Sequence, residues 1–154
     1  MKPPKIISES DFLAPPLPAG PGSVLALTEE LYPVVGKFHL LLGLRVWRVQ
    51  GEGKYQFYPV GLTTAPWLWR EAVGHIEQLA REEGEPGEPV SIRKSLDDEL
   101  RIARQTYKGR ENIAARVWKI APTMAYPQRN GINLTASTWL QLLPAVREVL
   151  KGFA

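Results

Sequence analysis

The sequence predicts an α+β fold in which two β-β-β-β-α repeats form an intramolecular pseudo-dimer of antiparallel sheets, with one helix in each repeat. The segment Arg45–Val49 reads like the segment Arg116–Ile120, and each is followed by a threonine-containing segment that ends in Trp-Leu. The two arginines are 71 residues apart, and the two tryptophans, Trp67 and Trp139, are 72 residues apart. A period of this size indicates two copies of a small domain rather than a solenoid of short repeats.

Composition divides the chain into four parts. Residues 1–22 contain six prolines and are expected to form an extended N-terminal arm, because proline fits neither a regular helix nor a central strand. The first repeat is expected over 23–83, an acidic linker with glycine and proline over 84–91, and the second repeat over 92–154. A single repeat buries too little surface to be stable alone, so we expect the two repeats to share one core.

The first repeat begins with a strand-like pattern from Ser23, with an interruption expected at Pro33. A long apolar strand is predicted over Phe38–Val49, and a second strand follows the glycine-containing break, over Tyr55–Leu62. A helix follows, because Thr63 or Thr64 can cap its start, a proline suits its first turn, and apolar residues recur at helical spacing.

The second repeat shows the same order. Glu99–Thr106 and Asn112–Ile120 are predicted strands, and Tyr107–Arg110 is a tight turn whose glycine permits a positive φ. Ala121–Asn130 is expected to be a loop, followed by a short strand. Thr135 then caps a helix in which a proline predicts a bend.

Composition also excludes several classes of protein. The chain has no cysteine and only two histidines, so a disulfide framework and a thiolate or multi-histidine metal site are not expected. No apolar run is long enough to span a bilayer, and the first residues lack a signal-peptide core. We expect a cytoplasmic, nucleoid-associated protein that has no cofactor and no metal, does not bind membranes and, lacking any catalytic constellation, is not an enzyme.

Positive charge is concentrated in one part of the second repeat. Residues 101–129 hold seven basic residues against the single acidic Glu111: Arg101, Arg104, Lys108, Arg110, Arg116, Lys119 and Arg129. Such an excess is typical of a surface that binds phosphate groups. The alternative is a solvated basic surface that binds no partner.

The repeated strand segment combines a cation with an aromatic ring. Side chains alternate along a strand, so Arg45 shares a face with Trp47, and Arg116 shares one with Trp118. An unpaired base can stack on the indole ring while the guanidinium group meets a phosphate. The alternative is that both tryptophans are core residues, because large aromatic side chains are mostly buried. The turn Tyr107–Arg110 places an aromatic residue and two cations at a hairpin tip, where burial is least expected.

The second repeat resembles the carboxy-terminal domain of the positive-cofactor-four family of transcriptional coactivators. The residues that carry the resemblance are Arg104–Arg110, the strand to Ile120, Gly131–Leu134 and Trp139. That family forms homodimers of four-stranded sheets with one helix each and binds single-stranded DNA on curved sheet faces. The resemblance implies nucleic-acid contacts from Tyr107, Lys108, Arg110 and Arg116. The sequence departs from the family pattern at Lys119, where an aromatic residue is usual, and at Gln105, where a basic residue is usual.

The first repeat matches the family less closely, because its turn reverses the order of the aromatic residue and the glycine. Its candidate nucleic-acid contacts are Lys37, Phe38, Arg45, Trp47 and Arg48. Two fused copies in one chain are also similar in architecture to the Pur and plant Whirly proteins.

Two functions follow as hypotheses. The first is a single-stranded DNA-binding protein of low sequence specificity that acts in transcription, replication or recombination, with RNA as another possible ligand. The second is a protein-interaction module of the same fold that binds the transcription or replication machinery rather than nucleic acid. Charge reversal of Lys108 and Arg110 separates them, because only the first predicts a loss of oligonucleotide binding.

Overall fold

The computed structural model describes residues 5–34, 37–82 and 87–153, and the side chains of 32–34, 37–38 and 107 are outside that description. The chain forms two compact units, Met1–Ala65 and Pro66–Ala154. The repeat boundaries expected from the sequence stay a prediction, because this division by contacts falls before the first helix rather than after it. In the described part, no helix combines the length and the apolar character needed to cross a bilayer.

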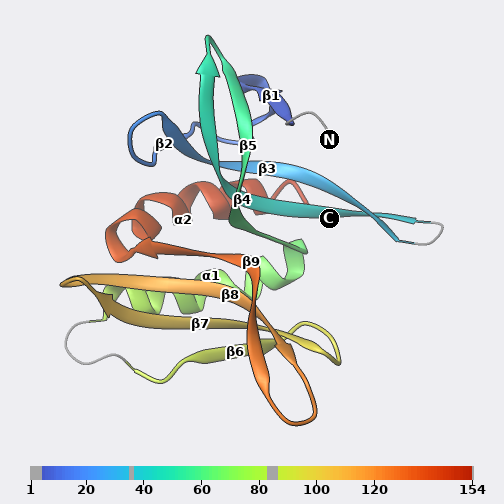
Figure 1. Cartoon of the computed structure of the whole chain (residues 1–154), viewed down its shortest axis with the longest axis vertical. Helices are drawn as coiled ribbons and strands as arrows, with labels where there is room; N and C mark the ends of the chain where they lie inside the picture. The colour runs from blue at the N-terminus through green and yellow to red at the C-terminus, as the bar shows by residue number, and fades with distance from the viewer. Residues whose placement is uncertain (1–4, 35–36, 83–86, 154) are drawn as a thin grey trace. The chain divides into compact units, whose positions relative to one another are not determined.

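The first unit is an antiparallel sheet with a short N-terminal addition (Figure 1). Strands β2 (Leu17–Pro18), β3 (Ser23–Val34), β4 (Lys37–Gly51) and β5 (Lys54–Thr64) pair in chain order. Strand β1 (Ile6–Ser8) pairs with β5 and leads into the 3-10 helix η1 (Glu9–Asp11). The predicted arm is thus an ordered part of this unit.

The second unit contains both long helices and the other four strands. These are α1 (Pro66–Arg81), β6 (Val90–Arg93), β7 (Asp98–Tyr107), β8 (Arg110–Ile120), β9 (Ala125–Thr135) and α2 (Ala136–Leu150). The strands again pair antiparallel in chain order, β6-β7-β8-β9. Helix α1 contacts β6, β7 and β8, while α2 contacts β8, β9 and α1.

Alternation along the strands of the second unit separates a helix-covered face from an open face. Leu100, Ile102, Ile113 and Val117 are buried, as are the α2 residues Trp139, Leu142, Leu143 and Val146. The indole nitrogen of Trp139 donates a hydrogen bond of 2.8 Å to the carbonyl oxygen of Ile113, which fixes the start of α2 against β8. The intervening residues of β7 and β8 therefore form the open face.

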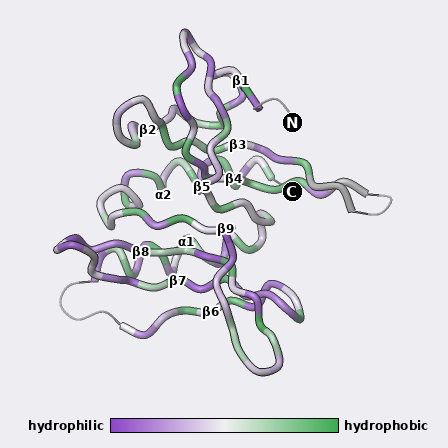
Figure 2. The backbone as a smooth tube through the Cα atoms, viewed as in Figure 1, coloured by the Kyte–Doolittle hydropathy of each residue, from purple (hydrophilic) through white to green (hydrophobic). Residues whose placement is uncertain are grey.

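Several local predictions are confirmed. The turn between β7 and β8 has φ angles of 50° at Lys108 and 74° at Gly109, the two positive values of a two-residue hairpin turn. This turn is coloured purple, for hydrophilic residues, in Figure 2. Thr135 caps α2, since its hydroxyl oxygen accepts a hydrogen bond of 3.2 Å from the backbone nitrogen of Thr138.

Other local predictions are wrong. Strand β3 runs through Pro33 without interruption, and Val90 and Ser91 of the expected linker belong to β6. Most of the loop expected over Ala121–Asn130 is the first half of β9, because Pro127 lies beside a register shift where the ladder of hydrogen bonds is broken.

The tryptophan in α1 that corresponds to Trp139 is Trp69, not Trp67. Trp69 is the fourth residue of α1 and Trp139 the fourth residue of α2, and both are completely buried. Trp67 is 45% exposed, so the prediction that it belongs to the core is wrong. The offset between the repeats is therefore 70 residues at the helices, slightly less than the sequence pattern indicates.

Candidate nucleic-acid interface

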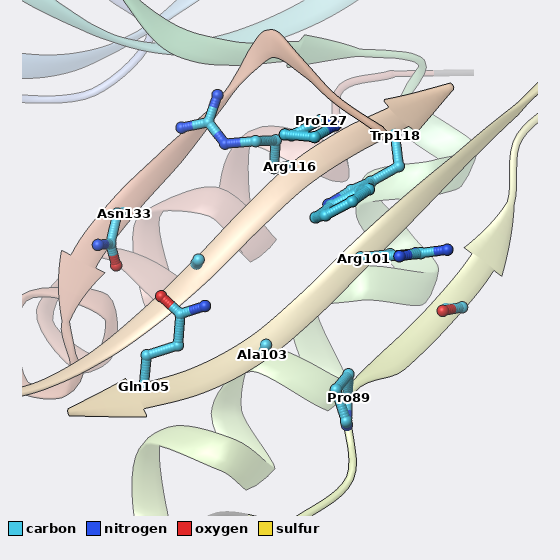
Figure 3. Close-up of a pocket in the computed structure, with 10 residues that line it drawn as sticks. Pro89, Arg101, Ala103, Gln105, Arg116, Trp118, Pro127 and Asn133 are labelled. Carbon is cyan, nitrogen blue, oxygen red and sulfur yellow. The ribbon is translucent and has the colours of Figure 1, made fainter. Parts of the chain in front are cut away.

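The open face of the second unit carries a hollow, here called the sheet pocket, with a volume of about 620 Å³. It crosses all four strands, and its lining includes Arg101, Ala103, Gln105, Arg116, Trp118 and Asn133 (Figure 3). A volume of this size is within the range of cavities that bind small molecules, about 300–1,000 Å³. The pocket therefore has room for at least one base.

One end of the sheet pocket joins a cation to an aromatic ring. The guanidinium carbon of Arg101 lies 4.4 Å from the centroid of the Trp118 ring, and Trp118 is only partly buried (Figure 3). The Nε of Arg101 donates a hydrogen bond of 2.7 Å to Oε2 of Glu99. This hydrogen bond is the main reason that the pKa of the Glu99 carboxyl group is lowered, so Glu99 stays ionised and holds Arg101 against the ring.

A second cation lies directly across the sheet from the first. Arg101 of β7 pairs with Arg116 of β8, and like charges at opposite positions repel each other. Arg116 is held separately, because its Nη1 donates to the carbonyl oxygens of Gln128 at 2.8 Å and Arg129 at 3.2 Å. An anion bound between the two guanidinium groups would relieve this repulsion, which makes the pair suitable for a phosphate group.

Gly131 allows this arrangement of Arg116. The two residues are directly opposite on β9 and β8, and a Cβ atom at Gly131 would lie 2.6 Å from Cγ and 2.8 Å from Cα of Arg116. Any larger residue would therefore push the arginine out of place. The register shift that follows, between Arg116 and Trp118, bends the strand next to the aromatic ring.

The same local geometry is present in the first unit. Arg45 pairs with Gly61, a register shift follows before Trp47, and Nη1 of Arg45 donates a hydrogen bond of 3.3 Å to the carbonyl oxygen of Tyr58. Tyr58 precedes Gly61 by three residues, as Gln128 precedes Gly131. The two units thus share a register, a bulge, a close glycine and an arginine contact.

The corresponding face of the first unit is closed. Trp47 is only 1% exposed and forms a cluster with Ala26, Tyr55, Phe57 and Phe12. The Phe12 ring, which follows η1 in the N-terminal arm, lies 4.8 Å from the Tyr55 ring and 6.3 Å from the Trp47 ring. The arm therefore covers the position that is open in the second unit, and Trp47 cannot stack on a base in this conformation.

The chemistry of the two faces also differs. Ala26 is opposite Arg45, in the position that Arg101 has opposite Arg116, so the first unit lacks the second cation. Burial lowers the pKa of the Arg45 guanidinium group, and the nearby Glu30 carboxylate opposes this shift. Arg45 is further held by a cation–π contact of 4.5 Å with the Phe57 ring. Arg45 and Trp47 are thus structural here, and the alternative of core residues applies to the first repeat.

Replacing Phe12 with alanine is expected to destabilise the protein, because the ring packs on Tyr55 and Trp47. We expect a loss of about 1–2 kcal/mol in the free energy of unfolding, as for a partly buried aromatic side chain. Urea denaturation measures it, with Leu96→Ala as control because Leu96 is 93% exposed. Equal stability of the Phe12→Ala protein and the wild type would show that the arm contributes nothing to the first unit.

The remaining predicted contacts are distributed as follows. Arg104 faces the helices with a side chain only 6% exposed and paired with Glu111 at 2.9 Å, so its prediction as a nucleic-acid contact is wrong. Lys119 points away from Trp118 and lies 3.9 Å from both Asp97 and Asp98. Exposed residues outside the sheet pocket are Lys108, Arg110, Arg129 and Arg48. The side chains of Lys37, Phe38 and Tyr107 lie outside the described residues.

The sequence interpretation missed Gln105 and Asn133 as part of the site. The pattern contains a signal for Gln105, because Arg101, Ala103 and Gln105 alternate along β7 and must share a face. Asn133 follows the register of β9, which sequence alone did not reveal because most of β9 was predicted to be a loop. Among the described residues, no group of His, Asp and Glu side chains gathers as metal ligands.

Comparisons with known proteins give a limited result. Neither a protein-family model nor a curated protein matches the sequence. Among solved structures, the chain is similar to a bacteriophage T5 homolog of the eukaryotic transcription coactivator PC4, which is implicated in recombination-dependent DNA replication. The identity is 15%, the TM-score is 0.38, and the match covers 45% of this chain and 81% of that chain. At this level the similarity does not indicate which residues bind a ligand.

Proposed function

We propose that this protein binds single-stranded DNA through the open face of its second unit, and acts in transcription, replication or recombination without catalysing a reaction. The observation that carries the proposal is the sheet pocket with Arg101 stacked on Trp118 and Arg116 across the strand from Arg101. A base can lie against the ring while its phosphate lies between the cations. Stacking and phosphate contacts of this kind tolerate any sequence.

Unpaired strands suit this face better than duplex DNA. The ring that stacks a base is part of a sheet surface, and in a duplex the faces of the bases are covered by their neighbours. The resemblance of the second repeat to the positive-cofactor-four family adds to the proposal. RNA presents the same bases and phosphates and remains a second candidate ligand.

We further propose that the chain arose by duplication and that its repeats form an intramolecular pseudo-dimer that shares one core. The shared register, bulge, glycine and arginine contact around Arg45 and Arg116 support the duplication. Under this proposal the two faces have diverged. The second unit binds DNA, and the first keeps its geometry under the cover of the arm.

Fluorescence anisotropy with a labelled oligonucleotide tests the proposed function. The single strand should bind more tightly than the duplex of the same sequence, and log K should fall linearly with log salt, at a slope of about −0.7 for each phosphate contact. A slope of zero would exclude binding through phosphate contacts. Charge reversal of Lys108 and Arg110 distinguishes the protein-interaction alternative, which predicts no change in oligonucleotide binding.

Removing the partner of Arg101 should strengthen DNA binding. Glu99→Gln deletes a carboxylate that competes with phosphate for the guanidinium group, so we expect affinity to rise by about 2- to 10-fold, equivalent to ~0.5–1.4 kcal/mol at the lower range for an ion pair. Anisotropy measures the change. Glu148→Gln on α2 is the control, because Glu148 is 75% exposed and is outside the pocket. Weaker binding by Glu99→Gln would mean that Glu99 positions Arg101 for the ligand rather than competing with it.

The same carboxyl group gives the ion pair a defined pH dependence. The pKa of Glu99 is lower in the folded protein than its ordinary value of 4.5, so the pair stabilises the fold above that value. This contribution is lost as pH falls below 4.5 through the folded pKa. The Glu99→Gln protein should therefore lose less stability than the wild type over that acidic range, as measured by thermal unfolding.

A further inference from the structure

The end of the sheet pocket away from Trp118 is built differently from the cationic end. Ala103 of β7 pairs with Ala114 of β8, and Ala114 pairs in turn with Asn133 of β9. One row across three strands is therefore alanine, alanine, asparagine. Gln105 occupies the next row of the open face on β7. In Figure 3 the carboxamide groups of Gln105 and Asn133 lie on one side of Ala103, and Arg101 and Trp118 lie on the other.

The two alanines leave a shallow floor on which a flat group can rest. Both are partly exposed and line the pocket, and their methyl groups project least from the sheet. Among the described residues, neither Gln105 nor Asn133 has a hydrogen-bond partner, and both side chains are exposed. Each carboxamide therefore has one donor group and one acceptor to offer a ligand on that floor.

We propose that Gln105 and Asn133 form a base-reading subsite that selects adenine, beside the sequence-tolerant site at Trp118. This inference rests on the proposed function, since it assigns the base preference of the same face. The subsite takes a base that lies on Ala103 and Ala114, next to one whose phosphate is held by Arg101 and Arg116.

Adenine is the base whose chemistry matches two carboxamides at once. Its amino group has two hydrogens, one beside the ring acceptor N1 and one beside the ring acceptor N7. Each of these edges is a donor next to an acceptor, which is the complement of a carboxamide. Away from the sugar, guanine, cytosine and thymine each offer one edge of this kind. Both edges of a base are accessible in a single strand, because no complementary strand covers them.

The spacing of the two residues permits this arrangement. Gln105 and Asn133 are two strands apart and one row apart along the strands, which places their backbones about 12 Å from each other. Both side chains can extend toward the floor between them. A base held edge-on by both would fill the space between the carboxamides.

The test uses thymidine octamers that differ at one central position: thymidine, adenosine or 7-deazaadenosine, which stacks like adenosine but lacks N7. We expect the wild type to bind the adenosine octamer about 5- to 10-fold more tightly than the thymidine octamer, as for one well-formed bidentate contact. The 7-deaza octamer should lose a large part of this gain. In the Gln105→Ala/Asn133→Ala protein the preference should disappear, while affinity for the thymidine octamer changes by less than about twofold.

Gln78→Ala is the matched control, because Gln78 is an exposed carboxamide on α1 and is outside the pocket. It should keep the wild-type preference. Equal wild-type affinity for the three octamers, or an adenosine preference that persists in the double variant, would overturn the base-reading subsite and leave the proposed function intact. Failure of the wild type to bind any octamer would instead overturn both.

Discussion

Replacing Trp118 with alanine should weaken binding of single-stranded DNA by about 5- to 150-fold, the effect of removing one base–aromatic stacking contact worth about 1–3 kcal/mol. Trp118 is the ring of the sheet pocket, and Arg101 already lies over it at 4.4 Å. A base that enters the pocket therefore meets a ring whose position is fixed. The loss should be the same at low and high salt, because the indole ring carries no charge.

Trp67→Ala is the matched control for this variant. Trp67 is 45% exposed on α1, and it does not line the sheet pocket. It should bind the oligonucleotide as the wild type does. If both tryptophan variants lose affinity equally, or if Trp118→Ala binds normally, the stacking role of Trp118 is wrong.

Replacing Arg101 with alanine should also weaken binding, by about 10- to 150-fold, because a hydrogen bond to a charged group contributes about 1.5–3 kcal/mol. This variant should differ from Trp118→Ala in its salt dependence. One phosphate contact is lost, so the slope of log K against log salt should become shallower by about 0.7. The two variants thus separate stacking from phosphate neutralisation in the same assay.

Two controls make the Arg101 result interpretable. Arg81→Ala removes a guanidinium group from α1 that is 65% exposed and distant in sequence from the pocket strands, and it should leave the slope unchanged. The double variant Arg101→Ala/Glu99→Gln removes the unpaired carboxylate as well. If this double variant regains wild-type affinity, the loss came from the exposed Glu99 charge, and Arg101 is not a phosphate contact.

Much of the fold could be predicted from periodicity and turn chemistry. The hairpin turn at Lys108-Gly109, the threonine cap of α2 and the strand–helix order of both repeats follow from local signals that need no tertiary information. The strand β6 was missed because its four residues follow a linker-like composition. The first half of β9 was missed because Pro127 is tolerated only beside a register shift, which depends on the partner strand.

The candidate site was only partly predictable, because the sequence does not show which face is covered. Arg45-Val46-Trp47 and Arg116-Val117-Trp118 are the same pattern, yet the first tryptophan is buried under Phe12 and the second lines a pocket. The residue that decides this lies more than 30 positions away in the proline-rich arm. Arg104 was misplaced for a simpler reason: strand alternation relative to Arg101 requires it to face the helices.

The central claim is that the open face of the second unit, and not the equivalent face of the first, binds unpaired bases. Photo-cross-linking with a 5-iododeoxyuridine octamer tests it most directly, because this base couples to an aromatic side chain on which it stacks. Mass spectrometry of the digested complex should place the cross-link in the peptide that contains Trp118. A cross-link that maps instead to the peptide with Trp47, or to Trp67 on α1, would contradict the account.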